Sequence, residues 1–165
     1  LNMDEWAKME HSVKTPKHYI LNYGFHKNEY MESGAVEQAK RTGMPICEIN
    51  DRVRPSNDHR IKMRGMGPAE WLYLIHNADY IFTNSFHGMI FSFIFNKQVW
   101  ISDPNDGTFS RMEDFLISIG CEDRILDSKG MSNCGQFIDY KVVNELMEKN
   151  SQDSKRILFE ILKEV

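Results

Sequence analysis

Short apolar segments alternate along this chain with amphipathic segments of about ten residues, and this alternation most constrains the fold. The strand-like segments are residues 17–22, 45–49, 78–83 and 98–102, and the helix-like segments are residues 29–41, 68–77, 86–95 and 110–119. Consecutive strands separated by single helices form βαβ units, in which the strands are parallel. The sequence therefore predicts an α/β fold with a parallel sheet flanked by helices.

The ends of several predicted helices carry recognisable signals. Gly43 follows residues 29–41 as a stop residue, and Pro68 suits the first turn of the next helix. Ser110, with Glu113 three positions later, predicts a capping box. Residues 50–66 are polar and irregular, and we expect a long loop there. Two striped helices are expected to finish the chain, one with Val142, Val143, Leu146 and Met147, the other with Ile157, Leu158, Ile161 and Leu162.

Composition narrows the class of protein. A net charge of −4 disfavours nucleic acid as a partner, because phosphate binding favours a basic chain. No apolar run is long enough for a transmembrane segment. Cys47, Cys121 and Cys134 are odd in number and widely spaced, which favours free thiols in a reducing cytoplasm over disulfides or a zinc site. No metal site is predicted from the histidine spacing.

A polar corner interrupts two segments that are otherwise apolar, residues 79–82 and 89–95. The corner has the sequence Thr-Asn-Ser-Phe-His-Gly, residues 83–88. Ligands of parallel α/β sheets bind beyond the carboxyl ends of the strands, and this corner lies at such an end. We expect residues 22–26 and 102–111 at the same edge of the sheet.

This corner has the chemistry of an anion site. A helix beginning beside Ser85 offers unpaired N–H groups and a positive dipole end, and Gly88 permits a close approach to its backbone. His87 can donate a proton near neutral pH, and Arg111 begins another helix from which it can reach the same anion.

Each of these residues also has a purely structural interpretation. Asn84 and Ser85 are good helix caps, and His87 could be a structural hydrogen bonder. Arg111 could be a solvated residue paired with Glu113 or Asp114.

Several segments together resemble one known family. The core signature of the polysaccharide pyruvyl transferase family is similar to residues 67–100, GPAEWLYLIHNADYIFTNSFHGMIFSFIFNKQVW. Its next element resembles residues 109–126, FSRMEDFLISIGCEDRIL, and its usual ending resembles residues 138–162. The strand that opens its C-terminal half resembles YILNYG, residues 19–24. The resemblance covers nearly the whole chain.

The resemblance implies a two-domain GT-B-like fold with the site between two Rossmann-like halves. Residues 1–165 would form a single Rossmann-like domain, the C-terminal half, with the N-terminal half absent; Leu1 as first residue also suggests a fragment. Members transfer pyruvate from phosphoenolpyruvate to two sugar hydroxyls, forming a ketal on an exopolysaccharide or cell-surface glycan precursor. We then expect a bacterial cytoplasmic protein, free or at the inner face of the membrane, with a sugar or lipid-linked oligosaccharide as acceptor and no cofactor.

The resemblance also assigns roles to residues. His87 matches the family histidine as general acid, and Arg111 and the helix start at Ser85 would hold the donor anions. The remaining predicted substrate-binding residues are Asn84, Gly88 and Tyr23. Other branches have Arg-x-His at residues 85–87 and an arginine near residues 22–24. Either Arg111 or arginines within residues 52–64 replace those cations, or this branch uses another donor.

Two other functions remain open from the sequence. One is a GT-B glycosyltransferase using a nucleotide-sugar donor, for which Glu48 or Asp51 would supply the ribose carboxylate. The other is a non-catalytic glycan-binding module in which His87 has only a structural role.

Overall fold

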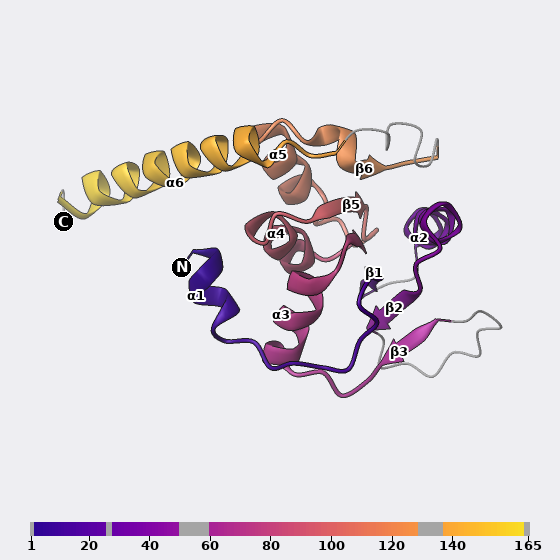
Figure 1. The fold of residues 1–165 in the computed structure, drawn as a ribbon. Coiled ribbons are helices and arrows are strands. Elements are labelled where there is room, and N and C mark those ends of the chain that lie inside the picture. The colour runs from indigo at the N-terminus through magenta and orange to yellow at the C-terminus, as the bar shows by residue number, and fades with distance from the viewer. Residues whose placement is uncertain (1, 26–27, 50–59, 129–136, 164–165) are drawn as a thin grey trace.

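The structure, a computed structural model, describes residues 2–25, 28–49, 60–128 and 137–163 (Figure 1). Its centre is a parallel sheet with the strand order β3-β2-β1-β4-β5-β6. The strands are β1 (Ile20–Tyr23), β2 (Ile46–Ile49), β3 (Ile61–Met63), β4 (Tyr80–Thr83), β5 (Gln98–Ser102) and β6 (Ile125–Leu126). The predicted parallel α/β fold is confirmed, and the strand order is that of a Rossmann-like domain.

The strand order reverses between β1 and β4. The chain runs outward from β1 through β2 to β3, then returns to place β4 on the other side of β1. The register pairs Tyr23 with Thr83, so both strands end at the same level. Such a reversal opens a crevice beyond the carboxyl ends of the two strands, where α/β proteins bind ligands.

Helices cover both faces of the sheet, as Figure 1 shows. One face packs against α2 (Glu29–Thr42) through a cluster that includes Ile20, Phe82 and Trp100. The other face carries the larger core and the remaining helices, which are α1 (Met3–Ala7), α3 (Pro68–Asn77), α4 (Phe86–Ile94), α5 (Ser110–Ser118) and α6 (Tyr140–Lys163). Tyr19, Leu74 and Phe93 are among the fully buried side chains of that core.

Some predicted helix ends are confirmed and others are wrong. Gly43 ends α2 with φ of 72°, and Pro68 opens α3. Ser110 is the first residue of α5 rather than its cap, because Phe109 precedes the helix and makes no side-chain cap. The predicted loop at 50–66 contains β3, and its residues 50–59 lie outside the described part of the chain. β3 and β6 escaped prediction because strands of two or three residues show no periodicity.

The two helices predicted at the end of the chain are one helix, α6. No glycine or proline interrupts residues 148–156, and the Gln152 amide donates to Glu148 Oε1 over 2.8 Å. Propagating an existing helix costs less than starting a new one, so the polar residues between the two stripes stay helical.

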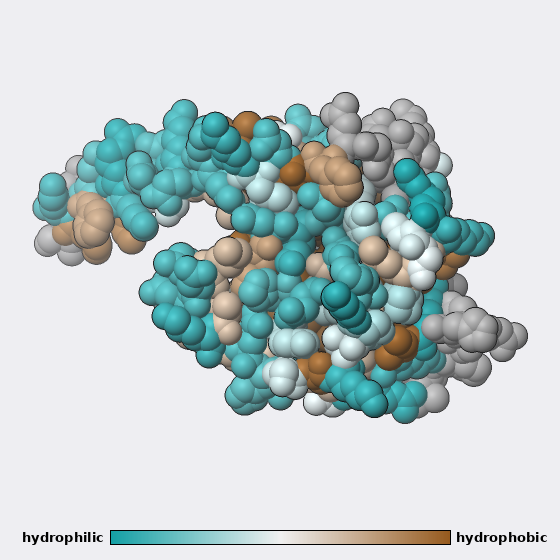
Figure 2. Space-filling view, viewed as in Figure 1, coloured by the Kyte–Doolittle hydropathy of each residue, from teal (hydrophilic) through white to brown (hydrophobic). Residues whose placement is uncertain are grey.

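The two halves of α6 differ in packing. Val143 is buried against the core, whereas residues 152–163 are exposed, with Ile157, Leu158, Ile161 and Leu162 between 52% and 61% accessible. Figure 2 shows this end of the helix standing clear of the body. No helix in the described part of the chain is both long and apolar enough to cross a membrane.

This difference predicts unequal effects of proline in α6. Asn144→Pro, in the packed half, should lower the free energy of unfolding by about 3 kcal/mol or more, because it breaks the helix beside Val143. Ser154→Pro should reduce helical ellipticity but leave the thermal midpoint nearly unchanged, since its turn packs against nothing in the described chain. An equal fall in thermal midpoint for both variants would show that the exposed half of α6 also contributes to the stability of the domain.

Candidate functional site

The corner after β4 is tied together by its own polar groups. Ser85 is the N-cap of α4, and its Oγ accepts a hydrogen bond from the Gly88 N–H over 3.3 Å. The Ser85 N–H donates to Thr83 Oγ1 over 3.1 Å. Ser85 thus has the capping role that its residue type predicts.

Asn84 joins the end of β4 to the end of β1. Its side chain is 2% exposed, and its Oδ1 accepts a hydrogen bond from the Phe25 N–H over 3.1 Å. A Cβ on Gly24 would lie 2.2 Å from that oxygen, so only glycine fits there. Asn84 therefore acts as a bridge between two strand ends and does not cap α4.

Gly88 and Tyr23 pack closely within the same corner. A Cβ on Gly88 would lie 2.5 Å from Thr83 Oγ1 and 3.1 Å from Tyr23 Cδ1. The close approach expected at Gly88 is thus made by two protein side chains. Tyr23 is half-buried, and this burial raises the pKa of its hydroxyl, an effect that a hydrogen bond with the Ser85 side chain partly offsets.

His87 and Arg111 each contact the ring of Phe86. His87 is exposed in the first turn of α4, and its ring lies edge-on to Phe86, with centroids 6.0 Å apart. The Arg111 Cζ lies 5.1 Å from the centroid of the same Phe86 ring, in a cation–π contact. Within the described residues Arg111 makes no ion pair with Glu113 or Asp114. The structure thus leaves its charge exposed at the start of α4.

The first turn of α4 completes this positive environment. Of its described N–H groups, that of Gly88 is taken by Ser85, while those of Phe86 and His87 have no acceptor within the helix. Unpaired N–H groups and the helix dipole favour an anion at this position. The His87 imidazole and the Arg111 guanidinium thus each lie beside Phe86 at the start of α4, next to the strand reversal.

The arginines within residues 52–64 are the other predicted source of positive charge for the corner. Arg52 and Arg54 lie outside the described residues, and Arg64 is exposed just after β3, so that alternative stays open for these three. Arg60 forms an ion pair with Glu32 of α2, which also accepts a hydrogen bond from the Asn22 amide over 3.3 Å. The charge of Arg60 is thus balanced by Glu32.

Sequence reasoning missed two residues that shape this edge. The Asn28 side chain caps α2 by accepting from the N–H groups of Tyr30 and Met31, and its amide donates to the Asp103 carbonyl over 2.8 Å. The loop after β5 is thereby fastened beside the corner. An asparagine directly before a predicted helix was the available signal. Phe25, held by Asn84, had no sequence signal.

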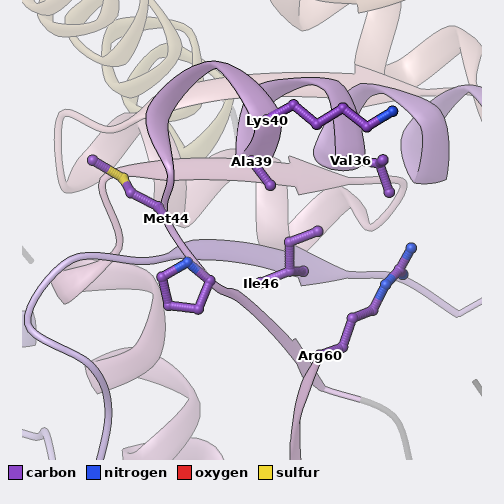
Figure 3. A pocket seen from close by; sticks show the side chains of 7 residues that line it. Val36, Ala39, Lys40, Met44, Ile46 and Arg60 are labelled. Atoms are coloured by element: carbon purple, nitrogen blue, oxygen red, sulfur yellow. The ribbon is translucent and has the colours of Figure 1, made fainter. Parts of the chain in front are cut away.

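A separate cavity of about 300 Å³ lies between α2 and β2 (Figure 3). It is lined by Val36, Ala39, Lys40, Met44, Pro45, Ile46 and Arg60. Apart from Arg60, which precedes β3, these residues come from the second half of α2, the turn after it and the start of β2, at the opposite edge of the sheet from His87. None of the predicted site residues lines it.

Cysteine and metal chemistry find no support in the described chain. Burial raises the pKa of both Cys47 and Cys121 to about 11, so their thiols stay protonated at neutral pH. Cys134 lies outside the described residues. The described residues contain no group of three or more histidines, cysteines or carboxylates that could hold a metal ion.

A family model agrees with the earlier resemblance. A family model described as polysaccharide pyruvyl transferase matches residues 1–105, which include the whole corner after β4 but not Arg111. No curated protein sequence matches the chain. Two solved structures of UDP-GlcNAc 2-epimerase from Methanocaldococcus jannaschii are similar, one in complex with UDP-GlcNAc and UDP, each with a TM-score of 0.47.

These two structures are 16% and 15% identical to the chain, of which they cover 88% and 90%. The chain in turn spans 41% and 48% of their lengths, less than half of each.

The packing at the corner predicts a cost for one added methyl group. Gly88→Ala should lower the free energy of unfolding by about 1–3 kcal/mol, because the new Cβ overlaps Thr83 Oγ1 and presses on Tyr23. The cost should be smaller in a Thr83→Ala background, where the nearest atom is removed. Equal costs in both backgrounds, measured by denaturant unfolding, would contradict the proposed overlap.

Proposed function

Because the chain belongs to the polysaccharide pyruvyl transferase family, we propose that it transfers pyruvate from phosphoenolpyruvate to two hydroxyls of a sugar, forming a ketal on an exopolysaccharide or cell-surface glycan precursor. The observation that carries this proposal is that His87 and Arg111 each contact the ring of Phe86, the first residue of α4. A donor with a phosphate, a carboxylate and a carbon that must be protonated needs such a set of groups.

Binding of the donor rests on two features of the corner. Phosphoenolpyruvate carries two anionic groups. In our proposal the Arg111 guanidinium holds one of them, while the N–H groups of Phe86 and His87 at the start of α4 hold the other. The packed floor beneath them holds the hydrogen-bonding groups of the protein in place. It is formed by Tyr23, Asn84, Ser85 and Gly88.

The chemical steps require one proton donor. His87 gives a proton to C3 of the enol, which makes C2 electrophilic, and a sugar hydroxyl adds to C2. The bond between C2 and the phosphate oxygen then breaks, and a second hydroxyl adds to complete the ketal. The two hydroxyl protons balance the reaction, since one replaces the proton given by His87 and the other leaves with phosphate. No carbon is oxidised or reduced overall by an external agent, so the proposal includes no redox cofactor.

The setting of the reaction is also part of the proposal. We place the acceptor hydroxyl base in a second domain facing this edge of the sheet, as the GT-B-like fold implied by the family resemblance would have it. The buried free thiols of Cys47 and Cys121 support a reducing cytoplasm.

Substitutions should separate proton transfer from donor binding. His87→Ala should lower kcat by about 100-fold or more, because the general acid is lost. Arg111→Ala should raise the KM for phosphoenolpyruvate by about tenfold to a hundredfold, with Arg111→Lys in between. The readout is phosphate release from phosphoenolpyruvate with a panel of sugar acceptors. His18→Ala is the matched control, since His18 precedes β1 at the opposite edge and contacts Asp79.

Ligand binding tests the two other functions. NMR titration with phosphoenolpyruvate should shift the resonances of residues 85–88 and Arg111, and the shifts should weaken in Arg111→Ala. The same shifts with UDP or CMP would favour a nucleotide-sugar donor instead. Unchanged kcat in His87→Ala would point to another proton donor, whereas sugar binding by a wild-type protein that releases no phosphate would point to a glycan-binding module.

A further inference from the structure

Helices α4 and α5 contact each other through two aromatic rings of α4. Within the larger core, the Phe93 ring of α4 lies edge-on to the Phe115 ring of α5, with centroids 5.6 Å apart. Phe86 precedes Phe93 by seven residues and Arg111 precedes Phe115 by four, so each pair lies on one face of its helix. The contact between Phe86 and Arg111 therefore continues the same helix interface toward the start of both helices.

The Phe86 ring is held in place by its surroundings. Phe86 is the first residue of α4, directly after the Ser85 cap, and its partly buried side chain packs against the larger core. A side chain anchored in this way loses little further freedom when another group rests on it. Phe86 is thus a fixed aromatic surface beside the candidate active site.

Arg111 depends on that ring for its orientation. The residue is exposed, and among the described residues its guanidinium makes no ion pair and no hydrogen bond, only the cation–π contact of its Cζ, 5.1 Å from the Phe86 centroid. An arginine side chain without contacts samples many rotamers, and fixing it costs conformational entropy. The Phe86 contact restricts those rotamers before a ligand arrives, so less entropy is lost on binding.

An aromatic partner suits this role better than an acidic one. A carboxylate beside Arg111 would accept hydrogen bonds from the guanidinium and neutralise its charge. The face of the Phe86 ring attracts the cation through its quadrupole and carries no formal charge. The positive charge and the N–H donors of Arg111 therefore remain available to an anion.

We propose that Phe86 is a positioning residue, whose ring orients the Arg111 guanidinium at the start of α4 so that it binds the anionic donor. Phe86 acts through Arg111 and does not itself react. The identity of the donor as phosphoenolpyruvate rests on the proposed function, whereas the positioning of Arg111 for an anion does not.

Stepwise fluorination of the Phe86 ring tests the proposal directly. Monofluoro-, difluoro- and trifluorophenylalanine at this position lower the negative charge of the ring face in steps while barely changing the shape of the side chain. The Kd values for phosphoenolpyruvate and for inorganic phosphate, measured by NMR titration, should rise in that order, by about two- to fivefold across the series.

The same series at Phe115 is the matched control. That ring lies in the same helix interface but contacts Phe93 rather than a cation, so its fluorination should leave both Kd values unchanged. Kd values that do not change across the Phe86 series would overturn the proposal, as would failure of the wild-type protein to bind either anion.

Double substitution distinguishes positioning from a purely structural role. Phe86→Leu should weaken binding of both anions by about two- to fivefold, and Phe86→Trp should retain it, because the indole face attracts cations most strongly. In an Arg111→Ala background Phe86→Leu should have no further effect, since no guanidinium remains to be oriented. An equal loss in both backgrounds would mean that Phe86 serves packing alone. Thermal unfolding of each variant checks that it is folded.

Enzyme kinetics separate this proposal from the proposed function. Fluorination of Phe86 should raise the KM for phosphoenolpyruvate and leave kcat within about twofold, because His87 rather than Arg111 supplies the proton. If pyruvyl transfer occurs and this KM is unchanged across the series, the positioning proposal fails while the proposed function stands. If anion binding follows the series and requires Arg111 but no pyruvyl transfer is found, the positioning proposal stands and the proposed function fails.

Discussion

The parallel pairing of β1 with β4 is the constraint on which the rest of the structure depends. These strands are separated in the chain by α2, β2, β3 and α3, and they meet only because the strand order reverses. Their register brings Tyr23 level with Thr83, and the turns that follow are joined by the bond from the Phe25 N–H to Asn84. Without this pairing the corner at the start of α4 would not exist.

The candidate site divides into a rigid floor and exposed reactive groups. The floor is so closely packed that an added Cβ would overlap its neighbours at Gly24 and at Gly88. Its polar groups are occupied by each other, which leaves ligand contacts to His87, Arg111 and the N–H groups above them. Such an arrangement holds the reactive groups in place while leaving their hydrogen-bonding atoms available to a ligand.

Two polar residues beside the corner serve the fold. Ser85 caps α4, and the Asn22 amide donates to Glu32, which pairs with Arg60. Among the described arginines, Arg111 is the one that the structure brings to the start of α4, from a different helix.

The sequence by itself determined the alternation of strands and helices, the polar corner at residues 83–88 and its place at a strand end. These features are local, since periodicity and cap residues act within a few positions. The sequence could not reveal β3 or β6, because very short strands show no periodicity. Nor could it reveal that α6 is continuous, because a polar segment between two apolar stripes does not by itself end a helix. Only the tertiary structure decided that Asn84 holds Phe25 and that Arg111 rests on Phe86. Those contacts join residues distant in the chain, and packing, rather than local preference, selects them.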